Sequence, residues 1–338
     1  MNAARFQDIV SRYPKLRMAV IGDFCLDRYF EIDPAPREAS IETGLPVHNI
    51  INVRCQPGGA GTILNNLAAL GLGAISPVGF CGDDGEGFEL QRALTARRGV
   101  IMDHFISTPE RRTFTYTKPL LMHLGKAPEE LSRLDIKNWT PTPPGVQKRI
   151  VESALAAMNN ANATILLDQV DIPETGVVTQ TLLSAIGKAT GALILADSRR
   201  GLRDFPPVIF KMNRAEFSAL TGASKDLSID ALKEAAQDLA RKNSQHVFIT
   251  LSAQGILGAA PNGEVAHVAA LPVRGEIDIV GAGDAVSANL TASLAAGATL
   301  EEALTLANAA ASVVIHQLGT TGTATVEQLK ATCLDKTA

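Results

Sequence analysis

The chain has 338 residues, of which 46% are apolar, and its formal net charge is −4 at pH 7. This composition supplies enough apolar material for a packed core and argues against global disorder. Charges of both signs are spread along the chain, whereas a nucleic-acid or membrane partner would need a clustered basic face. We therefore expect neither partner, and we expect residues 1–338 to form a single α/β domain with an appendage.

The cysteines and the N-terminal stretch indicate a compartment. Cys25, Cys55, Cys81 and Cys333 are scattered, without a C-x-x-C pair or a metal-ligand spacing, and are expected to be free thiols in a reducing environment. The first 18 residues carry charges throughout and lack the apolar core of a signal peptide. No apolar run reaches the roughly 20 residues of a membrane span. The sequence predicts a cytoplasmic protein.

Apolar runs alternate with helical patterns along most of the chain. Residues 16–23 predict a buried first strand, and residues 58–73 predict a helix that follows paired glycines and ends near Gly71. Further strands are expected at 74–82, 163–169, 192–198 and 246–252, and further helices at 83–99, 145–159 and from Pro173 to about Ala189. This alternation implies a mostly parallel sheet with helices on both faces.

Two stretches interrupt the alternation. Residues 28–56 and residues 111–136 have the pattern of β-hairpins or a meander rather than of crossover helices. They lie on either side of the first strand–helix units, so we expect them to pair as a small sheet beside the main domain. Such a sheet is a candidate lid over a binding site.

Near the C-terminus a glycine-rich turn, Gly281-Ala282-Gly283, runs into Asp284 and a long apolar segment. Free N–H groups at a helix N-terminus bind phosphate or developing negative charge. Asp284 is then either a helix N-cap, worth about 1 kcal/mol, or a general base that deprotonates an alcohol as it attacks a phosphoryl group. The stretch lacks the Gly-Lys-Ser/Thr of a Walker A loop and the third glycine of a dinucleotide fingerprint.

Three motifs follow one another along the chain: "PGGAGTILNNLAALG" near its start, "NRAEF" in its middle and "DIVGAGDAVSANL" near its end. Together they resemble the PfkB (ribokinase-like) carbohydrate kinases, over residues 16–330. Within that family the chain looks most like the heptose-phosphate kinase domain of the bifunctional ADP-heptose synthases. The segments that carry this likeness are "IGDFCLDRYF" (21–30), "TKPLLM", "LSRLD" and "ANAAASVVIHQLGTTG" (307–322).

The resemblance implies a fold and an activity. The fold would be a three-layer α/β/α sandwich with a mostly parallel central sheet plus a small β-sheet lid. The activity would be an ATP-dependent, Mg²⁺-requiring transfer of the γ-phosphoryl group to a hydroxyl of a sugar or sugar phosphate. Asp284 would be the catalytic base, and the N–H groups of Gly281, Ala282 and Gly283 would form the anion hole.

For the nucleotide side, the resemblance implies two groups of residues. Asn213 and Glu216 match the N-x-x-E motif that organises Mg²⁺ and its waters; the alternative for Glu216 is an exposed acid in a first helical turn. The residues expected beside the nucleotide are Asn213, Thr250, Ser252, Gly255 and Asn308. Ser252 stands where the family usually has glycine, and the alternative for Asn308 is a polar residue on a helix surface.

For the acceptor side, the resemblance implies a carboxylate that binds sugar hydroxyls after the first strand. Either Asp23 or Asp27 can serve while the other caps a turn, and Asp23 is slightly favoured. The other residues expected near the acceptor are Gly58, Gly59, Asn66, Asp168 and Arg133. Asp168 and Asp197 end successive strands, at the edge where ligands bind in open α/β sheets. Arg133 either reaches a phosphate on the acceptor or is a solvated charge of the lid.

The departures from the heptose-kinase pattern lie around the acceptor. Thr62 replaces a sugar-binding amide, and Arg199 stands where lysine is common. Residues 168–176 read "DQVDIPETG", where that branch has D-Y-x-K-G. The phosphoryl-transfer residues are intact, so the sequence supports the kinase mechanism without specifying heptose phosphate as the substrate.

The sequence also raises an alternative function, activation by K⁺ and a dimer. The alternative function is a non-catalytic sensor of a nucleotide or sugar with a kinase fold, whereas a Rossmann dehydrogenase is excluded because no glycine fingerprint follows the first strand. Part of the family is activated by K⁺ through loops that correspond to 278–280 and 315–323. The apolar stretch "LPVHNIINV" of the expected lid predicts a homodimer formed through the lid.

Overall fold

A computed structural model describes residues 1–35, 38–189, 191 and 193–334. Residue 192, the first of the strand expected at 192–198, and residues 36–37 of the expected lid lie outside the described residues. The strands of the main sheet are β1 Arg17–Gly22, β6 Ala74–Gly82, β7 Phe105–Thr108, β11 Ala163–Asp168, β12 Leu193–Ser198, β13 Ile209–Asn213, β14 Val247–Thr250, β15 Ile256–Ala259 and β16 Val265–Val268. Their order across the sheet is β16-β15-β14-β13-β12-β11-β1-β6-β7.

Most of this sheet is parallel, as predicted. Every neighbouring pair from β14 to β7 is parallel, and β15 and β16 extend one edge in antiparallel fashion. Parallel strands place their carboxyl ends at one edge of the sheet. The loops that follow β1, β11, β12 and β13 therefore meet at that edge.

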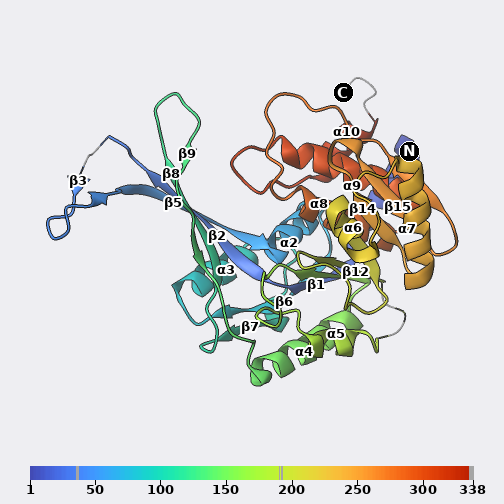
Figure 1. Cartoon of the computed structure of the whole chain (residues 1–338), viewed down its shortest axis with the longest axis horizontal. Coiled ribbons are helices and arrows are strands. Elements are labelled where there is room, and N and C mark those ends of the chain that lie inside the picture. The colour runs from blue at the N-terminus through green and yellow to red at the C-terminus, as the bar shows by residue number, and fades with distance from the viewer. Residues whose placement is uncertain (36–37, 190, 192, 335–338) are drawn as a thin grey trace.

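Helices cover both faces of the sheet (Figure 1). They are α1 Ala3–Val10, α2 Ala60–Ala69, α3 Gly85–Thr95, α4 Pro144–Asn159, α5 Gln180–Ile186, α6 Arg214–Thr221, α7 Ile229–Asn243, α8 Ala282–Ala295, α9 Leu300–Ile315 and α10 Val326–Leu334. Single turns of 3₁₀ helix occur at Tyr13–Lys15, Met102–His104 and Ser252–Gln254.

The alternation of side chains along β1 creates the three layers. Met18 and Val20 belong to a core with α1, α2, α3, α8, α9 and α10, whereas Ala19 and Ile21 belong to a second core with α4, α5, α6 and α7. All four side chains are at most 1% exposed. A strand that buries successive residues on opposite faces must have a helical layer on each side, which gives the predicted α/β/α sandwich.

A second sheet projects from the main body (Figure 1). Its strands are β2 Phe24–Ile32, β5 Ile50–Gly59, β8 Phe114–Leu121, β9 Glu129–Glu130 and β10 Leu134–Ile136, in the order β10-β8-β2-β5 with β9 paired to β8. A short hairpin of β3 Glu38–Ala39 and β4 Pro46–Val47 lies at its far end (Figure 1). The small separate sheet is thus present, built from both stretches that interrupt the helical pattern.

One predicted helix is much shorter than expected. The prediction places a helix from Pro173 to about Ala189, but α5 begins only after Thr179, whose hydroxyl accepts from the N–H of Leu182. The preceding segment forms turns, and the N–H of Val177 donates to the Asp23 carboxylate at 2.7 Å. A backbone N–H that binds a side chain from another strand is not available to a helix.

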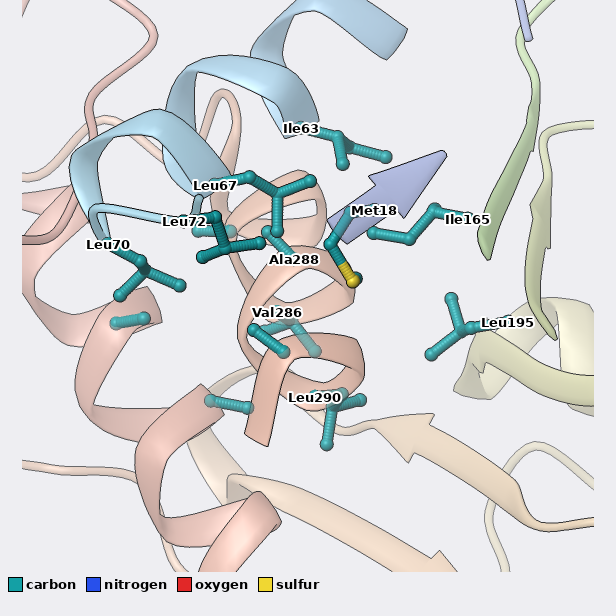
Figure 2. Packing of buried hydrophobic residues seen from close by; sticks show 14 of the residues in the cluster. Met18, Ile63, Leu67, Leu70, Leu72, Ile165, Leu195, Val286, Ala288 and Leu290 are labelled. Atoms are coloured by element: carbon teal, nitrogen blue, oxygen red, sulfur yellow. The ribbon is translucent and has the colours of Figure 1, made fainter. Parts of the chain in front are cut away.

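Helices α2 and α8 pack against each other in the first core. Leu67 of α2 lies among Met18 of β1, Val286 and Ala288 of α8 (Figure 2), and all of these side chains are buried. The glycine motifs expected around the active site precede these two helices, so this core fixes the two motifs relative to each other. The four cysteines are free, as predicted.

Among the described residues, no helix has both the length and the apolar character that a membrane span requires.

Candidate active site

The N-terminus of α8 presents backbone donors. Gly281 is the N-cap residue with a φ of 82°, a left-handed conformation that glycine adopts without strain. The N–H of Ala282 donates to the carbonyl of Ile279 at 3.2 Å. In the described part of the chain, the N–H groups of Gly281, Gly283 and Asp284 have no hydrogen-bond acceptor. The free donors of this loop are therefore these three, and the Ala282 N–H is engaged in a turn.

Asp284 is the third residue of α8 and does not cap it, because no side chain caps this helix. The N-cap interpretation of this residue is therefore wrong. Its side chain is half-buried. Burial raises the pKa of Asp284 to about 7; the Lys211 ammonium opposes this shift, and the Asp197 and Asp27 carboxylates add to it. A carboxyl with a pKa near neutrality suits general-base catalysis.

A buried lysine lies beside this carboxylate. Lys211 of β13 is 6% exposed and its Nζ lies 2.6 Å from Oδ2 of Asp197, which also accepts from Ser287 Oγ on α8 at 3.3 Å. Burial lowers the pKa of Lys211, but the Asp197, Asp284 and Glu216 carboxylates together outweigh this effect, so the pKa is raised and the ammonium stays charged. A Cβ at Gly283 would lie 3.1 Å from Nζ. This cation therefore lies against the turn formed by residues 281–283, called the glycine loop below.

Lys211 was missed from the sequence. The signal for it is a single lysine inside an otherwise apolar strand, "VIFKMN", because a lysine is almost never buried without a partner. The pattern predicts a buried ion pair, but it does not say which carboxylate is the partner.

Asp23 and Asp27 have different surroundings although both are buried. Asp23 accepts from the N–H of Gln169 at 2.8 Å and from that of Val177 at 2.7 Å, one bond to each oxygen. It therefore holds the loop after β11 against the end of β1. Burial and the neighbouring Asp168 carboxylate raise the pKa of Asp23.

The Asp27 side chain makes no hydrogen bond within the described residues and lines the pocket. Burial raises the pKa of Asp27 to about 6, while the charges of Lys118 and Arg133 act in the opposite direction. A Cβ at Gly58 would lie 2.5 Å from Oδ2 of Asp27, and one at Gly59 would lie 2.5 Å from the carbonyl of Asp23. The glycine pair thus lets β5 approach both acids closely. The geometry favours Asp27, rather than Asp23, as the acid with free oxygens.

One pocket of about 160 Å³ brings these groups together. Asp27, Gly59 and Thr62 line it on one side, and Gly281 and Asp284 line it on another. Three cationic side chains also line it: Lys118, Arg133 and Arg199. The pocket thus combines a carboxylate from the second sheet with the N-terminus of α8.

The three cations differ in their partners. Arg133 is paired with Asp135 at 2.7 Å, with its guanidinium over the Tyr116 ring, and Arg199 lies 3.3 Å from Asp171. Lys118 has no acidic partner within 4.0 Å among the described residues, and its charge lowers the pKa of Asp27. Lys118 was not singled out from the sequence, because a lysine on a half-exposed strand is ordinary.

The N-x-x-E motif forms a capping box. The side chain of Asn213 accepts from the N–H of Glu216 at 2.9 Å, and Oε2 of Glu216 accepts from the N–H of Asn213 at 2.7 Å. Glu216 is half-buried, and its other oxygen has no hydrogen-bond partner among the described residues. The motif therefore stabilises α6 and still offers one carboxylate oxygen at the carboxyl edge of the sheet.

The turn after β14 contains the other residues expected near the nucleotide. Thr250 ends β14, and its hydroxyl is 3.5 Å from the carbonyl of Met212 on the neighbouring strand. Ser252 is exposed and has a φ of 52°, in the left-handed region. That conformation favours glycine, which is a physical reason for glycine being usual at this position. Gly255 closes the same turn.

Three of the expected site residues that do not line the pocket are buried and bonded inside the protein. Asn66 is fully buried and donates to the carbonyl of Thr62 at 3.0 Å, so it braces α2. Asp168 is fully buried, accepts from Ser198 Oγ at 2.8 Å and pairs with Arg200 at 2.8 Å. Asn308 is 6% exposed and donates to the carbonyl of Ala269 at 2.8 Å, so it holds the loop that leads to Gly281.

A glutamine joins the second sheet to the main domain. Gln56 of β5 donates to Thr321 Oγ1 at 2.7 Å, and its carbonyl oxygen accepts from Thr320 Oγ1 at 3.0 Å. Thr321 lines the pocket, and a Cβ at Gly281 would lie 3.4 Å from the Thr321 side chain. These contacts tie the position of β5 to that of the glycine loop. The residues are 264 and 265 positions apart, so no local pattern reveals the contact.

Comparison with known proteins gives one family. A model described as pfkB family carbohydrate kinase matches residues 17–327. The chain is 30% identical over 310 residues to the bifunctional protein HldE of Gluconobacter oxydans, and 33% identical over 324 residues to that of Pectobacterium atrosepticum. These alignments cover 90% and 93% of this chain, but only 62% and 63% of the relatives.

Solved structures show the same fold at lower identity. The structure of Arabidopsis thaliana ribokinase complexed with ribose and ATP has a TM-score of 0.68 and 21% identity, and it covers 94% of this chain and 98% of that one. The phosphofructokinase-2 of Escherichia coli in complex with fructose-6-phosphate has a TM-score of 0.69 and 18% identity, with the same coverage. The fold is therefore ribokinase-like, as predicted.

Proposed function

Because this chain belongs to the pfkB family of carbohydrate kinases, we propose that it transfers the γ-phosphoryl group of ATP to a hydroxyl of a sugar or sugar phosphate. The observation that carries the proposal is the placement of Asp284. Its carboxylate, with a pKa raised to about 7, lines the same pocket as Asp27 and lies in the first turn of α8, where the N–H groups of Gly281, Gly283 and Asp284 are free.

The proposed reaction assigns one role to each group. The acceptor oxygen attacks the γ-phosphorus as its proton passes to Asp284, and the bond from that phosphorus to the bridging oxygen breaks, leaving ADP. The free N–H groups of Gly281, Gly283 and Asp284 stabilise the charge on the transferring group. Lys211 lies against the same loop and adds a fixed positive charge.

The acceptor side of the pocket favours a phosphorylated sugar. Asp27 has free oxygens that can accept bonds from two hydroxyls. Lys118, Arg133 and Arg199 line the same pocket. Two of them are paired with acids, but Lys118 has no acidic partner among the described residues, and a neutral sugar has no group that needs this charge. A phosphate on the acceptor is the group that matches this charge. We therefore propose a sugar phosphate as the preferred acceptor.

On the nucleotide side, Thr250, Ser252, Gly255 and Asn213 are proposed to contact ATP from the carboxyl ends of β13 and β14. Asn308 acts indirectly, because its amide holds the Ala269 carbonyl.

In the described chain, His, Cys, Asp and Glu side chains form no cluster of three that could hold a metal ion. This fits Mg²⁺, which is usually bound by phosphates, waters and one or two carboxylates. Glu216 has a free oxygen for such a water, and Mg²⁺ when bound supplies charge neutralisation of the phosphates.

K⁺ activation stays a prediction. The two loops expected to hold K⁺ are in contact, because the N–H of Asp278 donates to the carbonyl of Ile315 at 2.8 Å.

Asp284→Asn tests the assigned base. The amide keeps the size of the side chain but cannot take a proton, so kcat is expected to fall by about 10²–10⁴ while ATP affinity is retained. Acceptor-dependent ADP release gives kcat, and calorimetry gives the ATP affinity. Glu276→Gln removes an exposed carboxylate from the preceding loop. It is the matched control and should leave kcat unchanged.

If Asp284→Asn turns over nearly as fast as the wild type, another group is the base. Absence of ADP release from the wild type with every acceptor, together with tight ATP binding, favours the sensor.

The pH dependence of the wild type follows from the same group. Asp284 must be deprotonated to act as a base, and its pKa is about 7. We expect kcat/KM for the acceptor to rise with pH through this value and to be roughly tenfold lower at pH 6 than at pH 8. Lys211→Met removes a charge that lowers this pKa, so its profile should shift to higher pH. A flat profile from pH 6 to pH 8 contradicts the assignment.

Lys118→Ala tests the proposed phosphate on the acceptor. Loss of one charge-assisted bond to a phosphate is expected to raise KM for a sugar phosphate by about 10- to 100-fold. KM for ATP and for the unphosphorylated sugar should change little. Lys126→Ala removes an exposed lysine from the turn between β8 and β9 and is the control. An equal rise in KM for both sugars would contradict the assignment.

We also propose that the second sheet covers the acceptor and pairs with a second copy of the chain. Ile51 and Val53 of β5 are 62% and 45% exposed, and Leu134 of β10 is 60% exposed. Apolar side chains in such a patch are stabilised by a partner surface, and a two-fold axis would pair the patch with itself. Sedimentation velocity is expected to show a dimer; a monomer at all concentrations contradicts this proposal.

A further inference from the structure

A shallow groove adjoins the acceptor pocket. The two share Phe114, Tyr116 and Val170 as lining residues. Beyond these, the groove is lined by Trp139 and Ile172, with Lys137 and Asp171 at its polar side. It encloses only about 20 Å³, roughly one water molecule. A ligand group could therefore lie across it and stack on its wall, but could not be engulfed.

Trp139 is the only tryptophan of the chain, and its side chain is 70% exposed. It lies between β10 and α4, and the backbone next to it is fixed. The neighbouring Asn138 accepts from the N–H of Arg112 at 3.0 Å and donates to the carbonyl of Arg112 at 2.8 Å. The backbone that carries the indole is thus anchored to Arg112, so a ligand that covers the exposed ring does not have to order this segment.

A buried arginine holds both walls of the groove together. Arg111 is 5% exposed and donates to the carbonyls of Thr140 at 3.0 Å and Thr175 at 2.6 Å. The same two walls are joined where Thr142 Oγ1 donates to the carbonyl of Gly176 at 2.6 Å. Burial lowers the pKa of Arg111, and a buried cation whose hydrogen-bond partners are neutral carbonyls and a hydroxyl is costly. The walls are therefore a built structure rather than two loops that happen to meet.

One of these walls belongs to the segment that departs from the resembled kinases. Val170, Asp171, Ile172 and Thr175 all line the groove, and they lie within residues 168–176, which read "DQVDIPETG". Asp171 accepts from Arg199, which lines the acceptor pocket, at 3.3 Å and from Lys137, which lines the groove, at 2.8 Å. The altered segment therefore forms the boundary between pocket and groove.

We propose that this groove is a second acceptor subsite, and that the acceptor is a glycoside whose second ring stacks on Trp139. The inference rests on the proposed kinase function. The ring that is phosphorylated occupies the pocket, and the apolar face of the next ring covers the indole while its hydroxyls meet Lys137 and Asp171. Sugar rings bind exposed aromatic side chains in this way because one ring face is apolar and its rim is polar.

The single tryptophan makes the test direct. The emission of the wild-type chain is recorded with glucose, fructose and fructose 6-phosphate as one-ring probes, and with maltose, cellobiose, sucrose and trehalose 6-phosphate as two-ring probes. ADP release is measured with the same set. A blue shift that saturates with two-ring probes alone is expected, because a stacked ring removes water from the indole. No shift with any probe, or equal shifts with one-ring probes, overturns the proposal.

Variants separate stacking from folding. With a two-ring acceptor, Trp139→Ala is expected to raise KM by about tenfold, and Trp139→Phe, which keeps an aromatic face, by less than threefold. KM for ATP should not change. Phe88→Ala removes an aromatic side chain that is 67% exposed on α3 and is the control. An unchanged KM in Trp139→Ala overturns the subsite.

The outcomes also distinguish the two proposals. Turnover of one-ring acceptors without an emission change keeps the kinase function and overturns the subsite. An emission shift with two-ring sugars and no ADP release supports the sugar-binding groove and contradicts the kinase function. If the emission shifts with protein concentration and without sugar, a second copy of the chain covers Trp139, and the subsite proposal is wrong.

Discussion

A buried ammonium controls the electrostatics of the pocket. Lys211 lies against the loop before Asp284 and is paired with Asp197, so it offsets part of the repulsion among the carboxylates at the carboxyl edge of the sheet. Without that charge the Asp284 carboxyl would ionise at a higher pH, because burial and two neighbouring acids already raise its pKa. An ion pair in this position adds little net stability. Its value is that it keeps Asp284 able to ionise near neutral pH.

The path of the chain from β1 into β2 explains why two nearby acids differ. β1 belongs to the main sheet and β2 to the second sheet, and Asp23 lies between them. At that junction the loop after β11 has free N–H groups, and Asp23 accepts two of them. Asp27 is further along β2, where its neighbour in register is Gln56, and its oxygens stay free. The same residue type is therefore structural at one position and available to a ligand at the other.

The strand–helix alternation, the two stretches that interrupt it and the order of the motifs were enough to predict the three-layer fold, the second sheet and the placement of Asp284 at the start of a helix. It was not enough for contacts between distant segments. Lys211, Lys118 and Gln56 are polar residues in strands, and the side chains with which they interact come from other segments of the chain. Asn66 lies inside the first motif and Asp168 begins the segment 168–176. Both nevertheless bond inside the protein, Asn66 to the carbonyl of Thr62 and Asp168 to Arg200. Which way such a side chain faces depends on packing, which sequence spacing does not contain.

The two parts of the pocket tolerate change differently. The phosphoryl side is formed by the start of α8, which is buried from Ala285 onward, and by β13, which is buried from Ile209 to Met212. A substitution in these buried parts disturbs the fold as well as the chemistry. The acceptor side is formed by the second sheet and the loop after β11. Arg111 and Thr142 hold that loop through backbone carbonyls, and a carbonyl is present whatever the side chain. Residues 169–175 can therefore vary while the backbone keeps its course, so this side of the pocket can change without disturbing the N-terminus of α8.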